Sequence, residues 1–524
     1  MVNLRDALLN GLKSLPGTRE FHLHVLVSSP RKHNGLYPYA QPRCRSYLQD
    51  VLILLSEQST PDSPRVFVTA IEACVYNLPT TSSAILYISK VDSTGQGSFP
   101  SPTATLVISF LSYYADPATS PITVENLWIQ LFARAQNQYL FPNSSEFSGK
   151  RPLNDVKLCG WWKRVYTNVV NKITNRLPPT ALLKLYYLIP GYSQLEADHS
   201  LNIAGSLFPP HDGPRWTYGH PFSQTEIPLP CSINRTGSGT EDIVSWNLGT
   251  VIPSFDDDPK SRFMDELAHT DKEGLKSPPR KRPRTVSNTT DNAGTMGPVA
   301  DKVDSEKPLG ELAKVTPDEF WERMSFRQEC VAGAVTGFFT MVIRLAADSQ
   351  GGNGKIGNIR SAVSPLAPRA GQVSSNLNKR VIASLMTAVE FSTPERAIHA
   401  TESIESTIKG LCEGITSIST PIFRAPRPQT AKMEGSQGHD PPATSLEPPK
   451  TPPPRNRRLP DVSPNPFPEP EPTLETYNSY IYGSICVSNA PKSQNQKVLY
   501  GANEMPSAPQ VTVLTVRKKK KRAE

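Results

Sequence analysis

Residues Val66–Asp92 read VFVTAIEACVYNLPTTSSAILYISKVD and decide the fold. Two runs within them, Val66–Tyr76 and Ala84–Lys90, are rich in β-branched and aromatic residues and are separated by turn residues, a pattern typical of neighbouring strands. The same pattern precedes them at Glu20–Ser29 and Val51–Ser56. The sequence therefore predicts a β-sheet built early in the chain.

Helical patterns surround these strands. Thr316-Pro-Asp-Glu is a capping box, and it opens a helix that carries Phe320, Trp321, Met324, Phe326, Val331 and Val335. Together the patterns predict an α+β fold, a central mixed β-sheet surrounded by helices. The other predicted helices are Met1–Pro16, Thr103–Tyr114, Val124–Arg134, Leu158–Arg176, Pro259–Ala268 and a helix capped at Ser392.

Composition divides the 524 residues into folded and unfolded parts. The chain contains 52 prolines and 37% hydrophobic residues, which is enough for one sizeable core but not for order throughout. We predict a first folded part at 1–269, a basic disordered insert at 270–314 and a second, helical part at 315–420 that completes the folded domain. A proline-rich disordered linker at 421–510 and a hydrophobic, basic tail at 511–524 follow.

Charge and cysteine usage narrow the function classes. The net charge of +8 is concentrated in the runs Arg280–Arg284, Arg455–Arg458 and Arg517–Arg522, which suit nucleic acid, acidic chaperones or import receptors. The seven cysteines are scattered without a C-x-x-C pair, which favours a reducing compartment. We find no secretory signal and no membrane span, so we expect a soluble intracellular protein.

Familiar catalytic motifs find little support. His22 and His24 alternate on one strand face, but without a third ligand they are better interpreted as strand histidines, and no metal is predicted. Gly351–Gly357 imitates a phosphate loop but lacks the G-K-[ST] ending. Hydrolase, kinase and metalloprotease signatures are absent from the sequence.

Two other stretches point to chemistry. FDDDPKSRF (Phe255–Phe263) sets three carboxylates beside a lysine and an arginine, and Gln138–Val165 runs from an aromatic–proline turn to a tryptophan pair. Carboxylates beside a lone lysine, with aromatic rings to line a slot, suit a catalyst that handles a lysine side chain. The alternatives are solvated surface or, for Asp256–Asp258, capping of a helix that begins at Pro259.

These motifs give the sequence a family resemblance. It resembles the fungal histone acetyltransferases that modify histone H3 together with histone chaperones, first named as regulators of Ty transposition. The resemblance rests on Ser89–Asp92 (SKVD), Gln138–Pro142 (QYLFP), Trp161–Trp162 and Asp257–Phe263 (DDPKSRF), in that order. It implies a fold like that of the CREB-binding-protein acetyltransferases, with acetyl-CoA as the acetyl donor.

The resemblance also implies residue roles. Tyr139 and Trp162 would line the lysine slot, and Asp258 would be the principal catalytic carboxylate. Further carboxylates at Asp257 and Asp92 would assist, and Arg262 would hold the acidic cluster in place. Lys260 would become acetylated on itself and raise activity, because acetylation removes the cost of burying its charge.

Acetyl-CoA would lie between the SKVD loop and the tryptophan helix. Gln136 departs from the family, which has a small residue there, and the loop after Asp92 is about three residues shorter than the family pattern. By resemblance, the residues that contact the cofactor are Val91, Asp92, Ser93, Ser101, Pro102, Thr103, Ala104, Thr105, Phe132, Gln136, Arg151, Pro152, Leu153 and Trp161.

Partners follow from the same resemblance. The family acts on H3–H4, on tail lysines and on a core lysine near the DNA entry point, with nucleosome-assembly-type and anti-silencing-function-type chaperones. Pro278–Arg284 (PPRKRPR) predicts a nuclear import receptor and a nuclear location. The tail from Val511 could add a strand to a chaperone complex or be a plain basic tail. Direct DNA binding stays open, and the alternative to an enzyme is a non-enzymatic chaperone adaptor or DNA-associated scaffold.

Overall fold

The computed structural model describes residues 3–205, 214–231, 247–270, 309–327, 335–345, 364–413 and 465–490. In these residues ten strands form one sheet in the order β10-β1-β3-β4-β5-β6-β9-β7-β8, with β2 paired to β3. The pairs β5–β6 and β7–β8 are parallel and the others are antiparallel, so the predicted mixed sheet is confirmed. The strands are β1 (Gly17–Val27), β2 (Arg31–His33), β3 (Ser46–Gln58), β4 (Val66–Leu78), β5 (Ser83–Ser93), β6 (Asn126–Ala133), β7 (Leu182–Leu188), β8 (Trp216–Tyr218), β9 (Gly337–Arg344) and β10 (Tyr482–Asn489).

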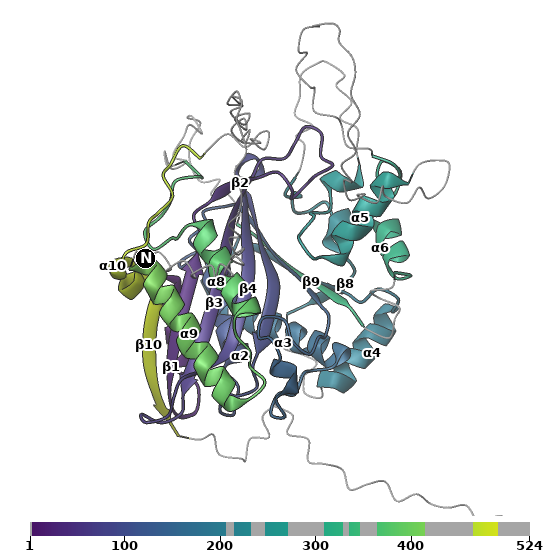
Figure 1. The fold of residues 1–524 in the computed structure, drawn as a ribbon. Helices are drawn as coiled ribbons and strands as arrows, with labels where there is room; N and C mark the ends of the chain where they lie inside the picture. The colour runs from purple at the N-terminus through teal and green to yellow at the C-terminus, as the bar shows by residue number, and fades with distance from the viewer. Residues whose placement is uncertain are drawn as a thin grey trace, which may run out of the picture.

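Helices cover both faces of the sheet (Figure 1). Side chains alternate along β5, so that Leu86 packs in a different core cluster from Ile85 and Tyr87. One face, the α2–α3 face, packs against α1 (Leu4–Leu12), α2 (Thr103–Ala115), α3 (Asp155–Ile173) and α4 (Gln194–Gly205). The opposite face, the α5–α9 face, packs against α5 (Pro259–His269), α6 (Pro317–Met324), α8 (Ser375–Thr387) and α9 (Pro394–Cys412).

Helix-capping signals in the sequence are confirmed where they are strongest. The Thr316 side chain accepts a hydrogen bond from the backbone N–H of Glu319 at 3.2 Å and begins α6. The first helix buries Leu4, Leu8 and Leu12 on one stripe, as the spacing predicts. The local sequence therefore determines where these two helices begin and which side they bury.

The prediction of a helix at Val124–Arg134 is wrong. These residues form β6, a central strand between β5 and β9, and seven of its eight side chains are buried. A strand that is covered on both faces needs apolar residues at every position, and such a run does not show the alternation that distinguishes a strand from a helix.

The later part of the chain contributes strands that the sequence analysis lacks. The α6 helix ends at Met324 instead of continuing towards Val335, and Gly337–Arg344 is β9. Within the region assigned to a proline-rich linker, Tyr482–Asn489 forms the edge strand β10, which pairs with residues 17–24 of β1. The short α10 (Leu474–Thr476) precedes it, and Figure 1 shows β10 beside β1 at one margin of the sheet. Residues 271–308 of the predicted insert and the whole tail at 511–524 lie outside the described residues.

Candidate active site

The site begins where two parallel strands separate. β5 and β6 pair from Ser83–Asn126 to Tyr87–Gln130, but β5 continues to Ser93 and β6 to Ala133. In the pairing with β4, residue 89 of β5 is skipped at a register shift, and such a bulge bends a strand. We name the space between 88–93 and 131–133 the β5–β6 opening. Both segments lie beyond the last pair of the β5–β6 ladder, Tyr87 with Gln130.

Asp92 organises the end of β5. One oxygen of its carboxylate accepts the backbone N–H groups of Tyr139, Leu140 and Phe141 at 2.7, 2.8 and 3.1 Å. The other oxygen accepts the backbone N–H of Ser93 at 2.8 Å and the Lys150 ammonium at 2.9 Å. Because five donors share one carboxylate, its geometry is that of a residue that positions the aromatic–proline turn.

Tyr139 and Trp162 lie on different faces of the sheet. The Tyr139 hydroxyl donates to the backbone carbonyl of Arg134, and its ring packs with the core cluster of the α5–α9 face. Burial, helped by the nearby charge of Asp92, raises the pKa of Tyr139 to about 12. Trp162 is buried in the core of the α2–α3 face, where its ring meets that of Trp161 edge-on at 4.7 Å between centroids.

The start of α3 is tied to the end of β6. Asn154 caps the helix by accepting the backbone N–H of Lys157, and the Asp155 carboxylate accepts the N–H of Ala135 at 2.8 Å. These two bonds fix the first turn of α3, the helix that carries the tryptophan pair, to the residues that follow β6.

Asp258 and Lys260 form a buried ion pair. Asp258 is the N-cap of α5, is 0% exposed, and accepts the backbone N–H of Lys260 at 2.9 Å and its ammonium at 2.5 Å. Lys260 is 4% exposed, and its Nζ lies 5.4 Å from the centroid of Phe255 and 5.1 Å from that of Phe338. The capping alternative and the catalytic one are thus compatible, because one carboxylate oxygen caps the helix and the other holds the lysine.

The neighbours of this pair face solvent. Asp257 adopts a left-handed backbone conformation, φ 61°, and is exposed, as is Arg262 one turn into α5. The turn at Asp257 directs the next side chain, Asp258, into the protein. Among the three consecutive aspartates only Asp258 is buried, which distinguishes it from the other two.

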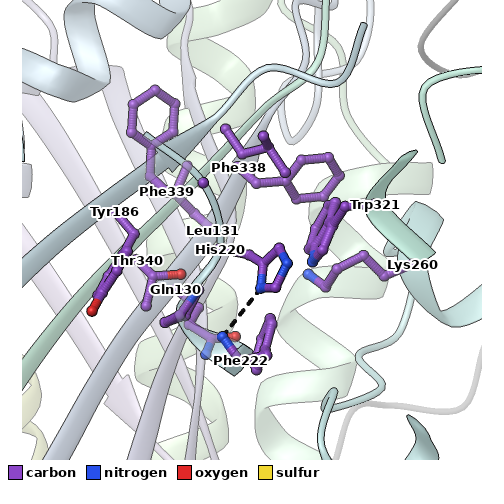
Figure 2. A pocket seen from close by; sticks show the side chains of 13 residues that line it. Gln130, Leu131, Tyr186, His220, Phe222, Lys260, Trp321, Phe338, Phe339 and Thr340 are labelled. Atoms are coloured by element: carbon purple, nitrogen blue, oxygen red, sulfur yellow. Dashed lines mark hydrogen bonds between the residues drawn. The ribbon is translucent and has the colours of Figure 1, made fainter. Parts of the chain in front are cut away.

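The Lys260 amine reaches a small cavity that the sequence analysis did not anticipate (Figure 2). His220 lines it, accepts the backbone N–H of Phe222 through Nδ1 at 3.3 Å, and pairs through Nε2 with Asp318 at 3.0 Å. Burial lowers the pKa of His220, against the opposing effect of Asp318. Trp321 stacks on His220 with centroids 5.9 Å apart. An isolated histidine in a loop carries no pattern by which sequence could have found it.

The predicted cofactor residues come from the end of β5, the start of α2, the end of β6 with the loop after it, and the segment that leads into α3. Pro102 is the N-cap of α2, and Thr103 at its first turn accepts or donates a hydroxyl hydrogen bond with Thr69 at 2.8 Å. The preceding loop is held by Arg19, which donates to the carbonyl groups of Ser98 and Pro100, each at 2.9 Å. Ser101, Gln136 and the segment Arg151, Pro152 and Leu153 are exposed, whereas Val91, Ser93, Ala104, Thr105, Phe132 and Trp161 are partly buried.

The predicted site residues therefore form two groups. Asp92 and Tyr139 meet at the end of β5, and Asp258 and Lys260 meet beside Phe338, whose ring lies 6.3 Å from that of Phe132 on β6. Trp162 belongs to the core of the opposite face, so a single slot that Asp258 and Trp162 share stays a prediction. In the part of the chain that the structure describes, no group of three or more metal-binding side chains is found. Over the same residues, no helix is long and apolar enough to cross a membrane.

Comparison with known proteins decides the family. Residues 118–407 match the Histone acetyltransferase KAT11-type domain. The chain belongs to this family. It is 30% identical over 368 residues to "Histone acetyltransferase rtt109" of Aspergillus flavus. This alignment covers 65% of this chain and 56% of that protein. It is 26% identical over 335 residues to the protein of the same name from Schizosaccharomyces pombe. This second alignment covers 62% of this chain and 68% of that protein.

A solved structure supports the fold of this KAT11-type chain. Rtt109 from Aspergillus fumigatus superposes with a TM-score of 0.55 at 24% identity, covering 78% of this chain and 96% of that one. The predicted family and fold class are thereby confirmed. The chain spans little more than half the length of the A. flavus relative.

Proposed function

We propose that this KAT11-type chain is a histone acetyltransferase that transfers the acetyl group of acetyl-CoA to lysine side chains of histone H3. The observation that carries the proposal is the β5–β6 opening. The turn at Tyr139, held by Asp92, follows this opening, and the buried Asp258–Lys260 pair lies on the α5–α9 face. The family membership of residues 118–407 supports the same chemistry.

The β5–β6 opening suits the amide-bearing arm of acetyl-CoA. The strand segment 91–93 is extended and pairs with β4 on one side, and the Ser93 N–H is held by Asp92. The main-chain groups of this segment that point away from β4 can pair with amides of the ligand as a strand would. At the start of α2, the backbone N–H groups of residues 103–105 have no partner within the helix and suit the pyrophosphate. Phe132 and Trp161 supply apolar walls, and Arg151–Leu153 and Gln136 lie towards the nucleotide end.

The reacting lysine must lose a proton before it can attack. A free lysine has a pKa of about 10.4, so only about one in a thousand is deprotonated at neutral pH. Asp258 attracts the incoming ammonium, and apolar walls around it disfavour the charged form. The ammonium first loses a proton to the carboxylate or to water, and the neutral amine then attacks the thioester carbonyl. The C–S bond breaks, the nitrogen gives up a second proton that ends on the sulfur, and CoA leaves as the thiol.

Lys260 controls whether Asp258 can do this. In the unmodified chain the carboxylate already holds the Lys260 ammonium at 2.5 Å. Acetylation of Lys260 converts the ammonium to a neutral amide, and Asp258 then lacks an ion partner and can receive the substrate's cation. The ion pair thus gives a physical reason for self-acetylation to raise activity.

The remaining roles follow from position. Asp257 and Arg262 sit exposed at the rim of α5, where Asp257 attracts a basic histone segment and Arg262 balances the acidic cluster. Tyr139 and Trp162 are the proposed walls of the lysine path, one from each face of the sheet. Asp92 supports this path by holding the turn that carries Tyr139.

The substrate is H3 in H3–H4, on tail lysines and on a core lysine near the DNA entry point, presented by histone chaperones in chromatin assembly. Nucleosome-assembly-type and anti-silencing-function-type chaperones are the proposed partners, with the tail from Val511 as a contact. Pro278–Arg284 is the proposed import signal for a nuclear location. Both segments lie outside the described residues, and their support is the sequence alone.

Radiolabelled acetyl-CoA with chaperone-bound H3–H4 tests the proposal. Wild-type protein is expected to label H3, and Asp258→Asn to lose most of the label because the amide cannot attract the ammonium. Asp256→Asn makes the same chemical change at an exposed neighbour and is expected to keep the activity. If wild type and Asp258→Asn are equally inactive while both bind the chaperones, the non-enzymatic adaptor is the better reading.

A further inference from the structure

Two cysteines from distant parts of the sequence meet in the core of the α5–α9 face. Cys44 lies two residues before β3, and Cys231 lies in the segment 214–231. Cys231 is 6% exposed and packs in the core cluster that contains Phe255. The partly buried Cys44 packs against the same cluster. Their side chains form a hydrogen bond, thiol to thiol, and both thiols are free. One cysteine of the pair is therefore accessible from outside and the other is enclosed.

Hydrogen bonds hold both segments where the thiols meet. The carbonyl oxygen of Pro230, next to Cys231, accepts the Thr81 hydroxyl at 2.6 Å. Ser46, two residues after Cys44, begins β3 and donates its hydroxyl to a carbonyl group of β2 at 2.6 Å. Because the backbone is anchored within two residues of each cysteine, the fold itself sets the contact between the two sulfurs.

The two thiols differ in reactivity. The hydrogen bond from Cys231 lowers the pKa of Cys44, against the opposing effect of partial burial. The same hydrogen bond, together with burial, raises the pKa of Cys231. Oxidants react with the thiolate form of a cysteine, and they reach an exposed sulfur before a buried one. Cys44 is therefore suited to be the attacking sulfur, and Cys231 is placed to react with it afterwards.

We propose that Cys44 and Cys231 form a redox modification site that hydrogen peroxide converts reversibly to a disulfide. The Cys44 thiolate attacks one peroxide oxygen, the O–O bond breaks, and the hydroxide that leaves takes up a proton to become water. Cys44 is then a sulfenic acid. The Cys231 sulfur attacks the sulfenic sulfur, the S–O bond breaks, and the hydroxyl group leaves as a second water with the Cys231 proton. Two thiols are oxidised while one peroxide is reduced, and a thiol reductant reverses the bond.

The disulfide ties together two segments that flank the start of α5. In the loop that carries Cys44, the Tyr39 hydroxyl donates to the Asp265 carboxylate of α5 at 2.5 Å. In the segment that carries Cys231, His220 lines the cavity that the Lys260 amine reaches. Because the thiols already touch in the reduced protein, the bond forms within the existing fold. It closes a long loop, so it stabilises the protein chiefly by restricting the unfolded chain.

Mass spectrometry of the full chain tests the pair. The reduced protein is treated with hydrogen peroxide, the remaining thiols are blocked with N-ethylmaleimide, and a digest made without reductant is searched for disulfide-linked peptides. The expected main product links Cys44 to Cys231 and is lost on addition of dithiothreitol. In urea unfolding, the ratio of folded to unfolded protein is expected to be about 100-fold higher for the oxidised chain than for the reduced one. Oxidation of other cysteines, such as the exposed Cys486, without this cross-link overturns the proposal.

Dimedone, a reagent for sulfenic acids, tests the order of attack. In Cys231→Ser the sulfenic acid at Cys44 has no thiol to react with, so its labelling by dimedone under peroxide is expected to rise several-fold over wild type. Cys412→Ser is the matched control, since Cys412 is buried in a different core cluster, and it should label Cys44 as wild type does. Equal labelling of Cys44 in wild type and Cys231→Ser overturns the proposal.

The cross-link in the wild-type chain decides the matter if Cys231→Ser does not fold. Both measurements read the state of the thiols and leave histone acetylation aside. The proposed function and the redox site can therefore fail independently of each other.

Discussion

Removal of the Lys150 charge is expected to lower the stability of the protein and to loosen the turn that Asp92 holds. Lys150 and Asp92 have side chains that are each 5% exposed and joined at 2.9 Å, and Lys150 also donates to the Ser144 hydroxyl at 2.7 Å. Breaking a buried ion pair by removing one partner costs about 3–5 kcal/mol. Asp92 keeps four backbone donors after Lys150→Met, so we expect a cost below that range, about 2–3 kcal/mol.

Urea unfolding at neutral pH measures this cost, with an unchanged m-value as the sign that only stability has changed. Lys90→Met is the matched control, since the Lys90–Glu72 pair on neighbouring strands is 27% and 21% exposed and is expected to contribute at most about 1 kcal/mol. In the folded variant the KM for acetyl-CoA is expected to rise more than kcat falls, because the turn at the β5–β6 opening loosens. Equal losses for Lys150→Met and Lys90→Met would refute this reasoning.

Three further outcomes are expected. Lys260→Arg keeps a cation on Asp258 that cannot be acetylated, so histone labelling should fall several-fold in the radiolabel assay; an unchanged rate counts against the switch. Burial lowers the pKa of His24 to about 3 from 6.5, so the unfolded chain binds a proton that the folded one does not as pH falls below 6.5. Below pH 6.5 the free energy of unfolding should therefore drop by at most about 1.4 kcal/mol per pH unit. The urea midpoint of His24→Gln should depend less on pH than that of wild type, and the same pH dependence in both proteins would contradict the prediction. Deletion of residues 465–490 exposes the edge of β1 and should lower Tm and promote aggregation in light scattering, whereas a chain of unchanged Tm would show that β10 is dispensable.

Sequence predicted the elements whose hydrophobic pattern matches the face that they bury. Strands β1, β3, β4 and β5 and helices α1, α2, α3 and α5 lie where their patterns indicate, because each has a clear apolar face or a capping residue. β6 and β9 were missed because a central strand is apolar on both sides and loses the alternation on which a strand prediction depends. β10 was missed because its partner β1 is more than 450 residues away, a pairing that local pattern does not reveal.

The site was predictable as residue types but not as an arrangement. Asp258 and Lys260 were found because they are two residues apart on one helix, and the structure joins them directly. Asp92 was expected to assist catalysis, yet its contacts with Lys150 and three consecutive backbone N–H groups depend on chain segments about 50 residues later. Which face Trp162 occupies depends on how α3 packs, and the cavity of Trp321 depends on tertiary packing alone.

Hydrogen exchange with and without acetyl-CoA tests most directly whether the β5–β6 opening holds the cofactor. Mass spectrometry of the full chain is expected to show slower exchange on addition of acetyl-CoA in peptides that cover 88–93, 101–105 and 131–141, and no change in those that cover β10 and β1. Protection confined to other segments, or none at saturating acetyl-CoA, would contradict the proposed seat of the acetyl donor.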